Sequence, residues 1–222
     1  DGQFRFQRKN VMGSGAKLSY VAAERRLLVE GGLDVIASDL SGETSITAQQ
    51  LEYLPDASKL SFTKGFRLIS PRGEITSDRT SLYMNAENQL TRLLAELDVE
   101  FVSPEKTARG SILDIDFEPE SGAIRSFRID ASDTSLAELT QKTGGKPQSI
   151  KGKSIQATPS QQPLLETLVF ESIRVSGEVS LKWPAAGIDS LTAGGLWAKN
   201  GSGQGFKELD FIGGVDFKRT SF

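Results

Sequence analysis

Four carboxylates at alternate positions are the residues of this chain whose types and spacing could do chemistry. Asp114, Asp116, Glu118 and Glu120 follow one another at i, i+2 spacing, which in a strand places them on one face. Their oxygens would suit Ca²⁺, and a carboxylate pair would suit the acid/base chemistry of glycoside hydrolysis. Neither pattern is specific, because the wet face of an antiparallel strand shows the same alternation. We interpret the run chiefly as an exposed strand face.

The chain lacks the residues on which most catalytic and metal sites depend. Among its 222 residues there is no histidine and no cysteine. This excludes a Ser-His-Asp constellation, a thiolate nucleophile, cysteine-based metal sites, and most zinc and non-haem iron ligand sets. We therefore expect no enzymatic activity and no cofactor.

Two further features suggest chemistry more weakly. Glycines at 201, 203 and 205 resemble a phosphate loop in composition, but no helical pattern follows them, so a hairpin turn over residues 200–203 is expected. Trp183, which precedes Pro184, and Trp197 could stack on sugar rings. Large aromatic residues more often pack in a core or along a sheet edge, which is the interpretation we favour.

Composition limits the class of partner. Lys and Arg number 26 against 29 Asp and Glu, so no basic excess exists and nucleic acid is not expected as a partner. Hydrophobic residues make up 37% and charged residues 25%, as in an ordinary soluble globular chain. No apolar run approaches the roughly 20 residues of a membrane helix. Because the chain begins at Asp1 rather than Met, we expect a processed or trimmed chain whose signal or anchor lies outside it.

The elements that must position these residues are strands arranged in repeats. Residues 46–102 contain two similar hairpin units end to end, and related units precede and follow them. Turns begin near residues 22, 55, 85 and 119, which gives spacings of 33, 30 and 34 residues. Such a period indicates an architecture that buries its core by stacking units. We expect six hairpin units, within residues 13–38, 46–70, 75–103, 111–130, 154–181 and 188–218.

Residues 132–153 interrupt this regularity. Ser135 and Glu138 stand at capping-box spacing before Gly144 and Gly145, so a short helix is possible on sequence grounds. A strand followed by a long loop fits equally well. We favour the strand, because both flanking segments are strands.

Alternation within the units predicts a sheet with one apolar and one polar face. Few long amphipathic helices are available to cover the apolar face, so the sheet must roll or clasp onto itself. Its interior is then either filled by its own side chains or open enough to hold acyl chains. The apolar face consists of Leu51, Tyr53, Leu60, Phe62, Phe66, Leu68, Leu93, Leu97, Val99, Phe101, Leu113, Ile115 and Phe117, and continues through Phe127 and Ile129.

One spacing of apolar residues and glycines recurs along the chain. It comprises Ile46-Thr47-Ala48, Leu51-Glu52-Tyr53, Lys59-Leu60 and Thr63-Lys64-Gly65-Phe66-Arg67-Leu68, an echo from Ile75, and the counterpart Leu18-Ser19-Tyr20 with Leu27-Leu28-Val29-Glu30-Gly31. Through this spacing residues 13–130 and, more faintly, 154–218 resemble the OstA-like family, the LptA- and LptC-type lipopolysaccharide-transport proteins of the periplasm.

The resemblance implies an all-β fold, an antiparallel β-jellyroll of V-shaped (β-taco) section that forms a single elongated domain over residues 1–222. It implies a periplasmic module that holds the acyl chains of lipid A between two half-sheets, at the thirteen apolar positions from Leu51 to Phe117 named above. Partners would be lipopolysaccharide and other β-jellyroll proteins docked through edge strands, including copies of this chain joined head to tail. Any membrane anchor would lie in a segment absent from this chain.

Two other classes of function remain open. A structural β-solenoid or adhesin-like module would have a dry core and no ligand. A carbohydrate-active β protein would use acidic residues such as Asp114 and Asp116. Bound lipid would favour the lipid module, and a fully packed interior would favour the structural module. Polysaccharide cleavage would favour the carbohydrate-active protein.

Overall fold

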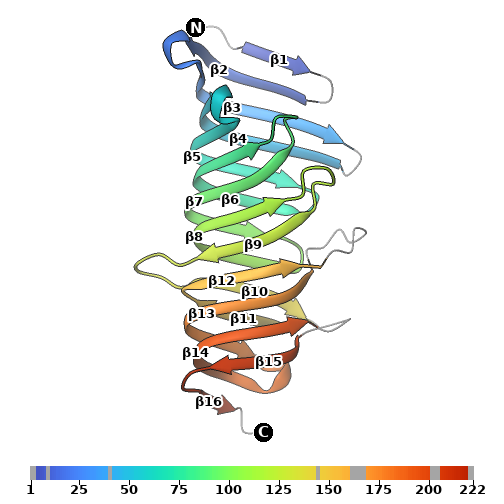
Figure 1. Cartoon of the computed structure of the whole chain (residues 1–222), viewed down its shortest axis with the longest axis vertical. Helices are drawn as coiled ribbons and strands as arrows, with labels where there is room; N and C mark the ends of the chain where they lie inside the picture. The colour runs from blue at the N-terminus through green and yellow to red at the C-terminus, as the bar shows by residue number, and fades with distance from the viewer. Residues whose placement is uncertain are drawn as a thin grey trace.

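The chain forms one long antiparallel sheet. A computed structural model describes residues 4–8, 11–39, 42–143, 146–160, 169–200 and 206–219, and within them sixteen strands join edge to edge (Figure 1). The only helical elements in this described part are three single-turn 3₁₀ helices at hairpin turns: η1 (Ala22–Glu24), η2 (Pro55–Ala57) and η3 (Pro184–Ala186). The expected all-β class and the hairpin series are therefore confirmed.

The strands follow one another along the sheet from the N-terminal to the C-terminal end. They are β1 (Phe4–Arg8), β2 (Val11–Val21), β3 (Arg26–Asp39), β4 (Gly42–Leu54), β5 (Lys59–Ser70), β6 (Gly73–Met84), β7 (Leu90–Val102), β8 (Lys106–Phe117), β9 (Ile124–Asp130), β10 (Ala137–Thr143), β11 (Lys146–Gly152), β12 (Ser154–Pro159), β13 (Phe170–Trp183), β14 (Ile188–Asn200), β15 (Phe206–Ile212) and β16 (Asp216–Arg219).

A line of β-bulges folds this sheet lengthwise. The register shifts once near the middle of each pairing from β2–β3 to β7–β8, and again between β13 and β14. On alternate strands two consecutive residues there have positive φ: Gly31–Gly32, Lys64–Gly65, Leu97–Asp98 and Gly177–Glu178. A bulge adds an unpaired residue and bends its strand, so the aligned bulges make a corner along the sheet.

The corner divides the sheet into two halves, called half-sheets A and B here. Half-sheet A contains β1, β10, β11 and β16, half-sheet B contains β9, β12 and β15, and every other strand contributes to both. The partners of β8 show the division: its first half pairs with β10 and its second half with β9. Strands β9 and β10 thus act as one long strand broken at residues 131–136, and the described strands form an up-and-down meander.

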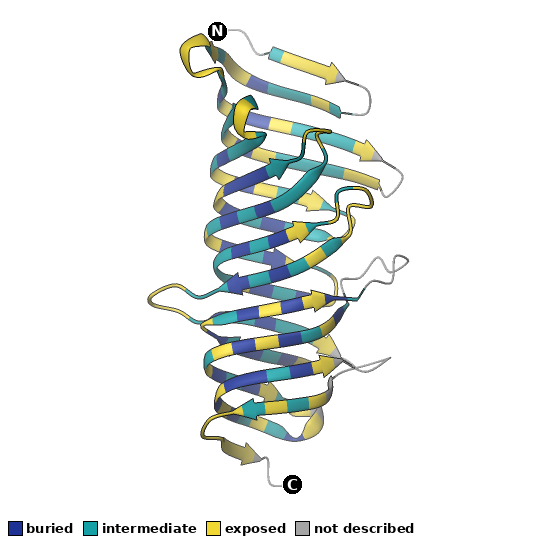
Figure 2. Ribbon diagram, viewed as in Figure 1, coloured by how far each residue is buried: buried dark blue, intermediate teal, exposed yellow. Residues whose placement is uncertain are grey.

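Cross-strand registers place one apolar row on the inner face of each half-sheet. In half-sheet B, for example, Phe62 pairs with Thr80, Thr80 with Ala95, Ala95 with Leu113 and Leu113 with Ile129. These five residues are all buried. In Figure 2, dark-blue buried positions recur along the central strands. The predicted alternation therefore holds wherever a strand is regular, because successive side chains point to opposite faces.

The predicted elements are found, with one difference in residues 132–153. The favoured strand is confirmed as β10 and the helix alternative is wrong, but a second strand, β11, stands where a long loop was expected. The hairpin units join into one sheet, because β3–β4, β5–β6 and β7–β8 pair as fully as the strands within each unit. The expected turn at 200–203 lies largely outside the described residues.

Candidate lipid-binding interior

The inner faces of half-sheets A and B face each other across the corner. Phe101 of half-sheet A packs edge-on against Phe127 of half-sheet B, with ring centroids 5.9 Å apart, and Phe127 lies 5.3 Å from Phe170. Closer to the corner, the rings of Phe62 and Phe66 lie 5.2 Å apart. Aromatic pairs at these separations stabilise beyond their buried area, so this cluster ties the two half-sheets together.

Twelve of the thirteen predicted lipid-binding residues lie on this inner face. Seven are buried: Phe62, Phe66, Leu93, Val99, Phe101, Leu113 and Ile115. Four are partly buried and pack against the core: Leu51, Leu60, Leu68 and Phe117. Tyr53 is partly buried and pairs with the inner-face residues Leu27 and Leu60.

Leu97 does not belong to the inner face, and its predicted place on the apolar face is wrong. Its side chain is 51% exposed and its φ is 65°, one of the two positive values at the β7 bulge. A bulge breaks the two-residue period, so counting every second residue through it misplaces the residue inside it. The signal for the bulges is in the sequence, since the pairs that begin at 31, 64 and 97 repeat every 33 residues.

The interior changes from open to closed along the long axis. On the inner face of β2, Leu18 is 48% exposed and Tyr20 63% exposed. In the centre, Leu113, Ile129 and Ile155 are fully buried. Figure 2 shows the same change, from teal and yellow on the N-terminal strands to dark blue in the central ones. The N-terminal end therefore presents an apolar surface that no other part of the described chain covers completely.

Lys106 closes the side of the interior away from the corner. It begins β8 in half-sheet A, and its side chain is only 3% exposed. Its Nζ lies 5.7 Å from the ring centroid of Phe170 in half-sheet B and 3.9 Å from a carboxylate oxygen of Glu105. Burial lowers the pKa of Lys106 from its ordinary value, and Glu105 opposes this only in part. The Lys106 ammonium group is thus held at low solvent exposure between half-sheets A and B, on the side opposite the corner.

Replacing Lys106 with methionine should raise the free energy of unfolding at neutral pH, and the gain should shrink as the pH rises. The pKa of Lys106 is lower in the folded protein than in the unfolded chain, where the pKa of this lysine is near 10.5. Between the two pKa values the unfolded chain binds more protons, so wild-type stability rises with pH there, while below both values the desolvation cost is fully present. Urea unfolding of both proteins between pH 7 and about 10.5 measures the difference. Lys142→Met, at an exposed lysine of β10, should show no such trend; a Lys106→Met gain that is constant with pH would contradict the buried charge.

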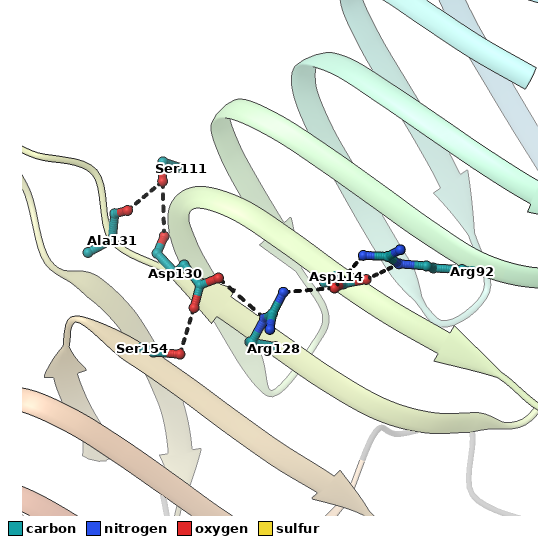
Figure 3. Close-up of polar contacts among 7 residues, drawn as sticks. All are labelled: Arg92, Ser111, Asp114, Arg128, Asp130, Ala131 and Ser154. Carbon is teal, nitrogen blue, oxygen red and sulfur yellow. Dashed lines mark hydrogen bonds and ion pairs between the residues drawn. The ribbon is translucent and has the colours of Figure 1, made fainter.

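A chain of ion pairs covers the outer face of half-sheet B (Figure 3). Arg92 of β7 donates from Nε and Nη2 to the two carboxylate oxygens of Asp114, at 2.7 and 2.9 Å. Arg128 of β9 donates to the same carboxylate at 2.9 Å, and its Nε lies 3.3 Å from Asp130. Ser154 of β12 donates to Asp130 at 2.6 Å. Four strands are thereby linked by side chains as well as by their backbones.

This network determines what the four alternating carboxylates can do. The hydrogen bonds to Asp114 raise the pKa of Arg92, and the Asp114 carboxylate is held between the guanidinium groups of Arg92 and Arg128. Asp116 accepts from Ser126 at 2.7 Å, and Glu118 lies 3.7 Å from Arg125. No group of three or more acidic residues suited to a metal ion occurs in the described ranges. The geometry thus favours an ion-paired strand face.

Comparison with protein-family models and with curated proteins identifies no relative of this chain. No protein-family model matches the sequence, and no curated protein matches it. None of the helices in the described residues has the length and apolar character needed to cross a membrane. What the protein does must therefore be inferred from its interior and its outer faces.

Proposed function

We propose that this protein is a periplasmic lipid-binding module of the OstA-like type, which holds acyl chains of a lipopolysaccharide at the N-terminal end of its interior. The proposal includes the fold expected from that resemblance, a jellyroll of V-shaped section whose limbs are half-sheets A and B. The observation that carries it is the apolar inner face, which is half exposed on β2 and continuous with a buried centre.

The N-terminal inner face has the chemistry that acyl chains need. Leu27, Val35, Ile46, Leu51 and Leu60 are only partly buried there, although each packs against the core. Each CH₂ group removed from water contributes about 0.8 kcal/mol, so a few chains can be held without a charged clamp. Phe62 and Phe66 are buried, and they would close such a groove on the side of the central strands.

The two ends of the sheet suit the docking that the proposal requires. Among the described residues, 17–21 of β2 pair only with β3, and β15 and β16 pair only with β14. Edge strands with free backbone groups take a further strand from a partner by β-augmentation. A neighbouring β-jellyroll protein, or a second copy placed head to tail, would extend the sheet and continue the apolar interior.

Site-specific photo-crosslinking tests the proposal. A benzophenone amino acid replaces Tyr53 on the inner face, or Ser61 on the outer face of the adjacent β5 as the matched control. In a lipopolysaccharide-producing bacterium the variant at 53 should form a lipid A adduct, detected by mass spectrometry, and the variant at 61 should not. Equal labelling at both positions, or labelling at neither in folded protein, would reject the acyl groove.

A structural module is the alternative, and one observation favours it. From β7 to β14 the interior is packed with buried side chains, among them Leu113, Ile155, Val179 and Leu181. A module of this kind would have no cargo, and its N-terminal inner face would be covered by a neighbouring protein. Native mass spectrometry separates the two functions, because only the lipid module should retain bound lipid after gentle purification.

A further inference from the structure

A polar cavity lies on the outer face of half-sheet B, on the opposite side of the sheet from the apolar interior. Its volume is about 420 Å³, within the roughly 300–1,000 Å³ typical of small-molecule sites. The polar lining comes from four neighbouring strands, β8, β9, β12 and β13, and one side of the cavity is formed by Trp197 of β14. Neither the lipid groove nor edge docking uses this surface.

The register of the sheet aligns the lining residues in one row. Arg128 pairs with Gln156, Gln156 with Arg174, and Arg174 with Trp197. Directly opposed residues on one face of an antiparallel sheet have Cβ atoms about 4.5–5.5 Å apart. Two guanidinium groups and one amide therefore stand in sequence beside an indole that is only partly buried.

The charges in the cavity are divided between paired and available groups. Asp114 is taken up by Arg92 and Arg128, as Figure 3 shows, and Asp116 accepts a hydrogen bond from Ser126. Arg174 is exposed and forms no ion pair within the described part of the chain. An arginine without a carboxylate partner is suited to bind a carboxylate or phosphate, often through two parallel hydrogen bonds.

We propose that this cavity binds an acidic saccharide. A sugar ring stacks on the indole of Trp197, because the apolar face of a pyranose matches a flat aromatic surface. Arg174 binds the carboxylate or phosphate of that sugar, and Gln156, between the two arginines, hydrogen-bonds to its hydroxyl groups. The site is independent of the acyl groove, since it lies on the other face of the sheet and its ligand is polar.

The two tryptophans of the chain make the test internal to one protein. In a ¹⁵N–¹H spectrum the indole signals of Trp197 and Trp183 are recorded while glucuronate, mannose 6-phosphate or neutral mannose is added. Glucuronate or mannose 6-phosphate should shift the Trp197 signal progressively, and neutral mannose should do so at least about tenfold more weakly. The Trp183 signal, from the other end of β13, should stay in place. The two acidic sugars distinguish a carboxylate ligand from a phosphate ligand.

Substitutions at the row separate binding from a general surface effect. Arg174→Gln should weaken the response to the acidic sugars about tenfold or more and leave that to mannose unchanged, whereas Arg109→Gln, on half-sheet A, should change neither. Equal responses to acidic and neutral sugars, equal shifts at Trp183 and Trp197, or no shift at Trp197 in the folded protein would each overturn the proposal. None of these results bears on lipid crosslinking at position 53, so the two proposals fail separately.

Discussion

Replacing Phe127 with alanine should lower the free energy of unfolding by about 3–5 kcal/mol, the range for a fully buried phenylalanine. Phe127 is 1% exposed and contacts the rings of both Phe101 and Phe170. Its loss leaves a cavity where half-sheet A packs on half-sheet B, and the paired backbones on each side limit collapse into that cavity. Urea unfolding followed by far-ultraviolet circular dichroism measures the change.

Leu97→Ala is the matched control for that experiment. Leu97 is as apolar as a core residue but is 51% exposed at the corner, so its truncation should change the free energy of unfolding by no more than about 0.5 kcal/mol. A cost at Leu97 comparable with that at Phe127 would show that Leu97 packs inside, against the structure. A cost below about 1 kcal/mol at Phe127 would show that the half-sheets do not rely on this contact.

Replacing Asp114 with alanine should lower the free energy of unfolding by about 2–3 kcal/mol, by removing charge-assisted hydrogen bonds and leaving two cations side by side. The Asp114 side chain is 13% exposed and receives three hydrogen bonds from Arg92 and Arg128. Thermal and urea unfolding in low and high salt measure the loss, which added salt should reduce by screening the exposed guanidinium groups.

Asp116→Ala supplies the comparison two residues further along the same strand face. Asp116 is exposed, and within the described ranges its side chain accepts one hydrogen bond, from Ser126, so its replacement should cost less than about 1 kcal/mol. Equal effects at 114 and 116 would indicate that the carboxylates act only as a general negative surface. A loss at Asp114 that salt does not change would argue against repulsion between Arg92 and Arg128.

Turn positions were predictable because turn chemistry is local. Pro55 leads into the single 3₁₀ turn of η2, and Ser58, which ends it, has φ of 46°. At the β8–β9 connection Gly122 has φ of 64° and donates its N–H to the carbonyl of Glu118. In both cases residues within one turn of each other supply the conformation and the hydrogen bond. The inner-face residues between such turns then follow from the two-residue period.

Leu97, at the corner, was misplaced because the two-residue period of a strand does not reveal a bulge. Leu97 has the type and parity of a core residue, yet it occupies a positive-φ position in a two-residue bulge. The two preceding bulges lie 33 and 66 residues earlier, at Lys64–Gly65 and Gly31–Gly32, and each contains glycine, which adopts positive φ easily. At 97 and 98 neither residue is glycine, so only the 33-residue repeat of the bulges could have indicated this one.

By itself, the sequence determined the meander of hairpins, the inner position of residues such as Phe62 and Leu113, and the exclusion of histidine and cysteine chemistry. These properties depend on residue types and on contacts between neighbouring strands. The tertiary structure alone decided where the interior is open, how Lys106 reaches Phe170, and that Arg174 and Trp197 border one cavity. Those arrangements depend on how the sheet bends and twists over many strands, and no local pattern of residues encodes the resulting distances.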